Sequence, residues 1–249
     1  MVMAPDATGT AKALARLDST IAIVTGGSRG IGLAIATALS ERGARVAIVG
    51  RDQAHLDRAV AQFPKGTVLG VRADVGNAAE AAAAIDAAVA SFGGLDVLVN
   101  NAGVGRFGAV ADMTVADWND VIHTNLTGVF NCCHAALPHL KARGGGWVIN
   151  ISSLAGSNPF VGGAAYCASK AGLNAFSEAL MQEVRYDNIR VSYIMPGSVA
   201  TGFGGRDADA GADWRIAAED VADIVLDLVT FPSRSLPSRI ELRPSRPKK

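Results

Sequence analysis

The chain has 249 residues, enough for one substantial hydrophobic core and short for two full domains. Hydrophobic residues make up 49% and charged residues 18%, a composition typical of a folded globular protein rather than a disordered one. Lysine plus arginine and aspartate plus glutamate number 23 each, so the formal net charge is zero. No basic surplus points to nucleic acid or to an anionic membrane as a partner.

No uninterrupted apolar run reaches the length of about 20 residues that spans a bilayer, and the first 15 residues do not have the pattern of a signal peptide. We therefore expect a cytoplasmic protein that does not bind membranes. The cysteines are odd in number, their spacing suits no zinc site, and we expect them to be small packing residues: Cys132, Cys133 and Cys167. We expect no metal site.

Short β-branched runs alternate along the chain with longer alanine-rich stretches of helical period. Strands are predicted at 21–25, 45–49, 67–71, 97–100, 147–151 and 190–195, with a possible last one near Ile240. Helices are predicted at 30–42, 53–62, 77–91, 115–141, 164–187 and 217–230. Apolar strands separated by helices indicate a parallel sheet covered on both faces. The predicted fold class is α/β: a Rossmann-type, doubly wound three-layer sandwich with a parallel sheet of about seven strands.

No internal repeat or interdomain linker is visible, so residues 1–249 are expected to form a single Rossmann-fold catalytic domain. Residues 1–17 are expected to be an N-terminal extension. The segment 202–215 is rich in glycine and aspartate, follows a strand end, and is predicted to be a substrate lid. The tail 232–249 is rich in proline and arginine and is predicted to be solvated packing or a contact arm.

The first predicted strand runs directly into a glycine-rich loop, Thr25-Gly26-Gly27-Ser28-Arg29-Gly30-Ile31-Gly32, and a helical pattern begins at once. Glycines are needed where a backbone turns sharply and approaches a pyrophosphate, whose charge is met by the helix N-terminus. A glycine-rich turn without a ligand is the alternative. The position after a strand and before a helix favours dinucleotide binding.

The end of the second strand bears on the identity of the nicotinamide cofactor. An acidic residue there binds the adenine ribose hydroxyls and repels a 2′-phosphate, whereas a nearby arginine does the reverse. Gly50 occupies the expected acid position, Arg51 follows it, and Arg29 in the glycine loop supplies a second positive charge. Asp52 is the opposing observation, but it directly precedes a helical stretch, which favours an N-cap role. The pattern predicts NADP(H), with NAD(H) less favoured.

Tyr166 and Lys170 are four residues apart in a helix-compatible stretch, so both project from one face. Such a pair is also common on ordinary surface helices. A tyrosine with its usual pKa of about 10 is a poor base at neutral pH, but a nearby ammonium stabilises its phenolate. Tyr166 is therefore the candidate proton donor in reduction and proton acceptor in oxidation. A serine hydroxyl can hold the substrate oxygen, and the residues alone leave Ser152 and Ser153 as rivals for this role.

Together these motifs resemble the short-chain dehydrogenase/reductase family, in its compact single-domain branch. The resemblance covers about residues 18–200. It rests on the loop spacing (Thr-Gly, three residues, then Gly-x-Gly) and on Asp74, Asn100-Asn101-Ala102-Gly103, Asn125, Ser153, Tyr166, Lys170 and Pro196-Gly197. The extended branch, which includes sugar epimerases, places its second glycine one residue earlier, where this chain has Arg29.

The resemblance implies a catalytic set of Asn125, Ser153, Tyr166 and Lys170. In it Lys170 also holds the nicotinamide ribose, Asn125 organises a water chain to the lysine, and the spacing selects Ser153. The implied cofactor-binding set is Gly26, Ser28, Arg29, Gly30, Ile31, Gly32, Arg51, Asp74, Val75, Asn101, Ala102, Gly103, Tyr166, Lys170, Pro196, Gly197 and Thr201. Within that set Asp74 lies near the adenine and Thr201 contacts the carboxamide. Both basic positions match NADP(H)-preferring members.

The sequence thus predicts an NADP(H)-dependent oxidoreductase that transfers a hydride between nicotinamide and a carbonyl or secondary alcohol. One alternative is a 3-oxoacyl-carrier-protein reductase, which shares the motifs, but residues 236–243 lack the Asp-Gly-Gly ending of those enzymes and look more like reductases of broad or hydroxy-acid specificity. The other is a cofactor-binding sensor without turnover, against which the intact catalytic set argues.

The expected partner is a small carbonyl or alcohol substrate with some apolar body, because residues 154–161 are mostly apolar. The family resemblance implies a homo-oligomer, a tetramer or dimer built on helices 115–141 and 164–187. The four histidines lie on predicted helices away from the strand-end motifs and are expected to form no site: His55, His123, His134 and His139.

Overall fold

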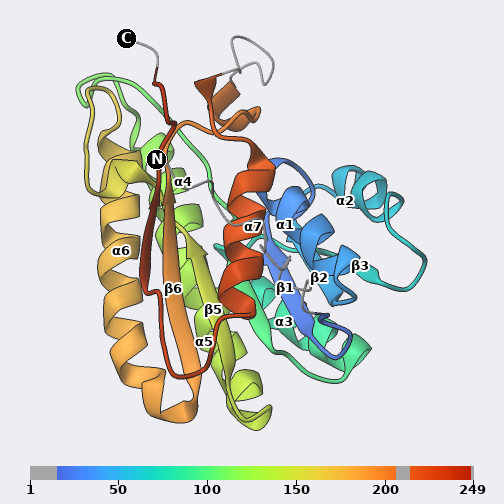
Figure 1. The fold of residues 1–249 in the computed structure, drawn as a ribbon. Helices are drawn as coiled ribbons and strands as arrows, with labels where there is room; N and C mark the ends of the chain where they lie inside the picture. The colour runs from blue at the N-terminus through green and yellow to red at the C-terminus, as the bar shows by residue number, and fades with distance from the viewer. Residues whose placement is uncertain (1–15, 206–213, 248–249) are drawn as a thin grey trace, which may run out of the picture.

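A computed structural model describes residues 16–205 and 214–247 of the chain. Seven strands form one parallel sheet in the order β3-β2-β1-β4-β5-β6-β7, with helices on both faces (Figure 1). The strands are β1 Ile21–Thr25, β2 Arg45–Gly50, β3 Val68–Arg72, β4 Val97–Asn100, β5 Gly146–Ile151, β6 Ile189–Pro196 and β7 Arg239–Leu242. The predicted fold class is therefore confirmed, and the possible last strand near Ile240 is β7.

The α-helices are α1 Gly30–Glu41, α2 Gln53–Val60, α3 Ala78–Phe92, α4 Val115–Ile122, α5 Gly128–Ala142, α6 Ala164–Val184 and α7 Ala218–Val229. Two hydrophobic cores separate the layers: one lies between the sheet and α1, α2 and α7, the other between the sheet and α3, α5 and α6. Alternation along β1 builds both, because Ala22 and Val24 face the first core while Ile21 and Ile23 face the second.

The helix predicted over 115–141 is interrupted, and that prediction needs correction. A single π-helical turn, His123–Thr127, separates α4 from α5. The wider turn contains Asn125, whose side chain is fully buried and hydrogen-bonds to the backbone of Val104 instead of pointing to solvent. π-turns of this kind occur often at functional sites.

The N-terminal end differs from expectation, because Leu17, predicted to belong to an N-terminal extension, is buried in the first core. The tail from residue 232 contains β7, the strand expected near Ile240, and residues after β7 line the cavity described below. Residues 1–15 and most of the predicted lid, 206–213, lie outside the described residues.

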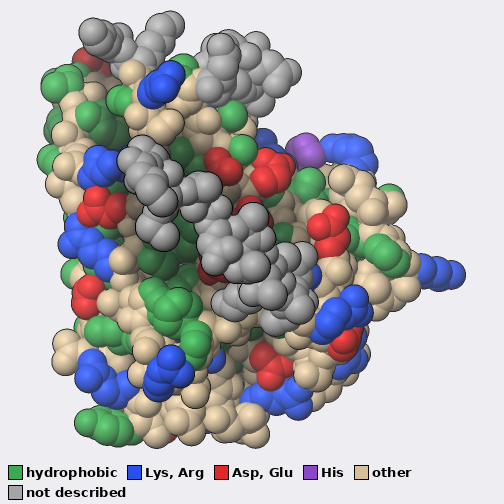
Figure 2. All heavy atoms as spheres, viewed as in Figure 1, with side chains coloured by type: hydrophobic (Ala, Val, Ile, Leu, Met, Phe, Trp, Pro, Cys, Tyr) green, Lys and Arg blue, Asp and Glu red, His purple; other side chains and the backbone are tan. Residues whose placement is uncertain are grey.

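All three cysteines are buried, Cys132 and Cys133 within the second core, as the packing interpretation predicts, and burial raises the pKa of the Cys132 thiol to about 12. Among the described helices, none has both the length and the apolar character needed to cross a membrane. On the face drawn in Figure 2, basic and acidic side chains are interspersed, in keeping with the equal numbers of the two in the sequence.

Candidate active site

A cavity of about 990 Å³ lies at the carboxyl ends of the strands and is lined by the segments that follow β1 through β6. The order β3-β2-β1-β4 reverses direction at β1, and open α/β sheets bind their ligands at such a switch point. The predicted site residues that line this cavity are Gly26, Ser28, Arg29, Gly30, Ile31, Arg51, Asp74, Val75, Asn101, Ala102, Gly103, Ser153, Tyr166, Lys170, Pro196, Gly197 and Thr201. Gly32 and Asn125, which were also predicted as site residues, are not among the residues that line the cavity.

The glycine loop is closely packed at two points. Gly26 has a φ of +63°, and a methyl group there would lie 2.9 Å from the Cα of Ala102. A methyl group on Gly32 would overlap the carbonyl oxygen of Gly26 and the side-chain amide of Asn101. These glycines let the backbone turn sharply and let the loop after β4 approach it, which is the shape a bound pyrophosphate requires.

Hydrogen bonds lock the two loops together. The side-chain amide of Asn101 donates to the carbonyl oxygens of Thr25 and Gly26, at 3.0 and 3.2 Å. The Thr25 hydroxyl accepts from the backbone N–H groups of Asn101 and Ala102, each at 3.0 Å. The sequence motif included Thr25, but its role as the clamp between β1 and β4 was missed because only the folded sheet makes these strands neighbours.

At the far end of the cavity, Arg51 is half-exposed, and its Nη1 atom lies 3.9 Å from Asp74 Oδ2 and 4.0 Å from Asp120 Oδ1. These separations are those of loose ion pairs in solvent, which hold the guanidinium weakly. A methyl group on Gly50 would meet Leu56 only at an ordinary 3.5 Å, so the backbone does not require glycine at the acid position. Asp120 was not anticipated, since nothing near it in sequence marks it as a neighbour of Arg51.

Asp52 caps α2, as predicted, and accepts a hydrogen bond from the backbone N–H of His55 at 2.9 Å. The same bond lowers the pKa of the Asp52 carboxyl. His55 itself lines the cavity, with its Nδ1 atom 3.1 Å from Asp52 Oδ2. The expectation that every histidine lies away from the strand-end motifs is therefore wrong for His55, because α2 begins only a short turn after the end of β2.

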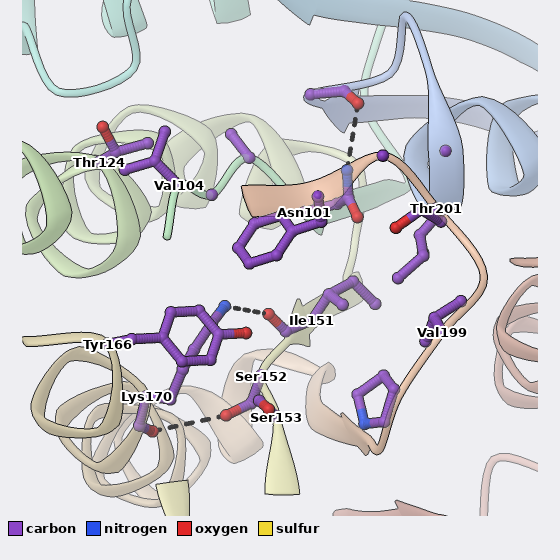
Figure 3. Close-up of a pocket in the computed structure, with 18 of the residues that line it drawn as sticks. Asn101, Val104, Thr124, Ile151, Ser152, Ser153, Tyr166, Lys170, Val199 and Thr201 are labelled. Carbon is purple, nitrogen blue, oxygen red and sulfur yellow. Dashed lines mark hydrogen bonds between the residues drawn. The ribbon is translucent and has the colours of Figure 1, made fainter. Parts of the chain in front are cut away.

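Tyr166 and Lys170 project from one face of α6 toward the end of β5 (Figure 3). Lys170 is almost fully buried, and its Nζ atom donates to the carbonyl oxygen of Ile151 at 2.7 Å. The same nitrogen lies 5.9 Å from the centre of the Tyr166 ring. Burial lowers the pKa of Lys170 to about 8, so the ammonium is present at neutral pH and lost in mild alkali.

The two candidate serines have different surroundings. The Ser152 side chain is buried, and its hydroxyl donates to Asn174 Oδ1 on α6 at 2.5 Å. The Ser153 hydroxyl accepts from the backbone N–H of Ala155 at 3.1 Å, which leaves its own proton available. The Ser152 hydroxyl proton is therefore used in a hydrogen bond to α6, whereas the Ser153 hydroxyl, which also lines the cavity, can still donate its proton to a ligand.

Asn125 joins three elements behind the cavity. Its Oδ1 atom accepts from the backbone N–H of Val104 at 2.8 Å, and its Nδ2 atom donates to the Val104 carbonyl and to the Ser169 hydroxyl, each at 3.0 Å. Ser169 immediately precedes Lys170 on α6. Asn125 therefore links the π-turn, the loop after β4 and the helix that carries the buried lysine.

Aromatic rings surround Tyr166. Phe107 and Phe203 lie 5.7 and 5.6 Å from it between ring centres, and Phe160 lies 6.0 Å from Phe107. Only Phe160 was anticipated, as part of the apolar stretch before Tyr166. Phe107 has no local pattern that marks it, and Phe203 fell within the predicted lid. The tail residues Arg243 and Pro244 also line the cavity and were missed.

Comparison with known proteins bears on this geometry. A family model described as short chain dehydrogenase matches residues 20–210. An uncharacterized oxidoreductase of Staphylococcus epidermidis is 32% identical over 231 residues, which cover 93% of this chain and all of the relative. A D-threitol dehydrogenase of Mycolicibacterium smegmatis is 38% identical over 191 residues, covering 76% of this chain and 74% of the relative.

The solved structures include an alcohol dehydrogenase from the archaeon Thermococcus sibiricus, complexed with 5-hydroxy-NADP. It is 27% identical, superposes with a TM-score of 0.85, and the match covers 92% of this chain and 99% of that one. The chain belongs to the short-chain dehydrogenase/reductase family, whose members are oxidoreductases that use a nicotinamide cofactor on alcohol or carbonyl groups.

Proposed function

We propose that this protein is an NADP(H)-dependent oxidoreductase that interconverts a carbonyl compound and a secondary alcohol, with Tyr166 as the proton donor and acceptor. The observation that carries the proposal is the buried Lys170 beside the Tyr166 ring, in the same cavity as the glycine loop. A sensor that only bound the cofactor could use Lys170 to hold the nicotinamide ribose, but it would have no need of the Tyr166 and Ser153 hydroxyl groups in the same cavity.

The residues present fit a nicotinamide dinucleotide. The close-packed glycines of the loop would admit a pyrophosphate at the start of α1, and Asn101 to Gly103 would line the adenosine side. When bound, the cofactor supplies or accepts the hydride. Arg51, which is held only by loose ion pairs, and the exposed Arg29 would favour binding of the 2′-phosphate of NADP(H). Because Gly50 stands at the expected acid position, no carboxylate at that position would repel this phosphate.

The chemical work of the protein falls on three side chains. The Ser153 hydroxyl donates to the substrate oxygen and orients it. Tyr166 gives its proton to that oxygen in reduction and removes it in oxidation. The Lys170 ammonium stabilises the phenolate that Tyr166 becomes, and Asn125 acts as a positioning residue through Ser169 and Val104.

The proposed cofactor preference can be tested by fluorescence titration of the purified protein with NADPH and NADH. Wild type is expected to bind NADPH more tightly. Arg51→Ala is expected to weaken NADPH by about 30-fold and NADH by less than threefold, because a charge-assisted phosphate contact contributes about 2 kcal/mol. Gly50→Asp, whose Cβ atom would meet its neighbours only at ordinary contact distances, should shift preference toward NADH. Equal losses for both cofactors in Arg51→Ala would remove the basis for NADP(H).

The proposed activity can be tested by following NADPH oxidation with a panel of ketones and a 3-oxoacyl thioester. Turnover of any of them that disappears in Tyr166→Phe supports the proposal. Tight NADPH binding with no turnover on the whole panel would favour the sensor function instead. A strong preference for the thioester would identify the 3-oxoacyl reductase alternative.

A further inference from the structure

Three phenylalanines from separate parts of the chain meet beside Tyr166. Phe107 follows β4, Phe160 precedes α6, and Phe203 follows β6. All three line the cavity, and Phe107 contacts both Phe160 and Tyr166, while Phe203 contacts Tyr166 from another side. We call these three residues the phenylalanine wall.

The rings of the wall are unusually exposed for large apolar side chains, at 41% for Phe107, 46% for Phe160 and 37% for Phe203. A cluster of exposed apolar surface inside a cavity, unlike a single exposed side chain, indicates a ligand that covers it. Because the cluster adjoins the reacting residue, that ligand is the substrate rather than the adenosine end of the cofactor.

Glycines in the backbone make room for the wall. A methyl group on Gly105 would lie 2.8 Å from the Phe107 ring and 2.9 Å from the Phe203 ring. A methyl group on Gly163 would lie 2.6 Å from the Phe160 ring. The rings therefore lie directly against glycine backbone, in space that a side chain on Gly105 or Gly163 would occupy.

The ring geometry suits an aromatic partner. Phe107 and Tyr166 meet at 66° between ring planes, and the other two contacts are tilted at 41° and 53°. None of these contacts is a face-to-face stack, so the wall presents both ring edges and ring faces to a ligand. A further aromatic ring prefers to pack edge-on or offset against such surfaces. The rings themselves offer no hydrogen-bond partner to the hydroxyl groups of a polyhydroxylated chain.

We propose that the substrate is a ketone, or the corresponding secondary alcohol, that carries an aromatic ring within two carbons of the reacting carbon, and that the phenylalanine wall binds this ring. The inference rests on the proposed hydride transfer at Tyr166. In reduction the carbonyl carbon gains the hydride of NADPH, which becomes NADP⁺, and the carbonyl oxygen gains the proton of Tyr166. The C=O π bond is thereby replaced by one C–H and one O–H bond.

The test compares kcat/KM with NADPH for four ketones whose carbonyls are all unconjugated: 4-phenyl-2-butanone, 4-cyclohexyl-2-butanone, 2-butanone and 1,3,4-trihydroxy-2-butanone. We expect the phenyl ketone to exceed 2-butanone by about 30-fold, from burial of the ring. It should exceed the cyclohexyl ketone, which has similar bulk, by about fivefold because of the aromatic contacts. The trihydroxy ketone should be the poorest substrate.

Variants assign the effect to the wall. Phe160→Ala is expected to lower the ratio of phenyl ketone to 2-butanone by about tenfold. Phe231→Ala removes a phenylalanine of similar exposure, 38%, that does not line the cavity, and should leave this ratio unchanged. Equal loss of the ratio in both variants would overturn the inference.

The outcomes separate the inference from the proposed function. Turnover of the trihydroxy ketone at a rate equal to or above that of the phenyl ketone would overturn the aromatic substrate and leave Tyr166-dependent hydride transfer standing. Equal kcat/KM for the phenyl and cyclohexyl ketones would overturn the aromatic preference in the same way. No turnover of the phenyl ketone also overturns the inference, and the proposed function then depends on the other carbonyl compounds.

Discussion

The two ends of the cavity are built by different means. At the cofactor end, the glycine loop and the segment after β4 lie so close together that Gly26 and Gly32 have no room for a side chain. The backbone itself therefore forms this end of the cavity. At the reacting end, the surface is made of side chains that reach in from the ends of β4, β5 and β6 and from α6. The first end is marked in the sequence by one contiguous motif, whereas the second has no contiguous motif for most of its side chains.

The difference predicts that the reacting end can be disabled without loss of the cofactor. Tyr166→Phe should lower kcat by at least about 1000-fold, because it removes the proton donor but keeps the ring that packs against Phe107 and Phe203. The NADPH dissociation constant should stay within about threefold of wild type. Stopped-flow kinetics and fluorescence titration measure the two quantities.

A matched control for this substitution is Tyr186→Phe, which alters a tyrosine that is 91% exposed and outside the cavity. It should have wild-type activity. Residual activity in Tyr166→Phe within tenfold of wild type would contradict the role of the hydroxyl group and would make the two ends of the cavity less distinct than proposed.

The cofactor end should fail in the opposite way, through the backbone. Gly32→Ala places a methyl group against the Gly26 carbonyl and the Asn101 amide, and overpacking of this kind costs about 2 kcal/mol. We expect affinity for NADPH to fall about 30-fold and Tm to fall by about 5 °C. Calorimetry and titration test this, with Gly108→Ala as control, since no atom lies within 4 Å of a methyl group there. Wild-type affinity in Gly32→Ala would show that the loop tolerates side chains.

The same contrast explains how much could be predicted from the sequence. The fold class followed from the alternation of apolar strands and helices, and each predicted strand lies within one or two residues of its observed bounds. The glycine loop and the Tyr166–Lys170 pair, both singled out from contiguous motifs, line one cavity. These features depend on neighbours in the chain, for which residue spacing is sufficient information.

What the sequence missed depends on contacts between distant segments. The clamp at Thr25 needs β1 and β4 side by side, and the phenylalanine wall needs three loops at one sheet edge. The π-turn at Asn125 was predicted as regular helix, because its cause is a hydrogen bond to Val104, 21 residues away. The position of His55 was wrong for the same reason: helical periodicity does not tell where a helix lies against the sheet.

The buried ammonium at the reacting end predicts opposite effects of pH on activity and stability. Burial lowers the pKa of Lys170 from its ordinary 10.5 to about 8. Its charge is lost above pH 8, so kcat/KM for ketone reduction should fall about tenfold per pH unit there. Between pH 8 and 10.5 the unfolded chain binds this proton and the folded chain does not, so the stability contribution of Lys170 rises with pH.

The variant Lys170→Met isolates the contribution of Lys170 to the pH dependence of stability from that of the other groups that titrate in alkali. The free energy of unfolding of wild type minus that of the variant should increase from pH 8 to 10.5, as measured by denaturant melts at each pH. Below pH 8 the difference should be constant, because the lysine is then charged in both states. A difference that falls with pH would mean that the folded protein favours the ammonium, against the direction set by burial.

The smallest expected effect is at Asp52, and it sharpens the assignment of the cofactor end. If Asp52 only caps α2, Asp52→Ala removes the side chain that accepts from the His55 backbone N–H and lowers Tm by about 2 °C. Affinities for NADPH and NADH should then both stay within twofold of wild type, and Asp52→Asn, which can still cap the helix, should restore Tm. A selective loss of NADH affinity in both variants would instead identify Asp52 as a ribose-binding acid. The end of β2 would then carry one side chain that repels the 2′-phosphate, Asp52, and one that attracts it, Arg51. Because these two effects would oppose each other, the preference for NADP(H) would have to come from Arg29.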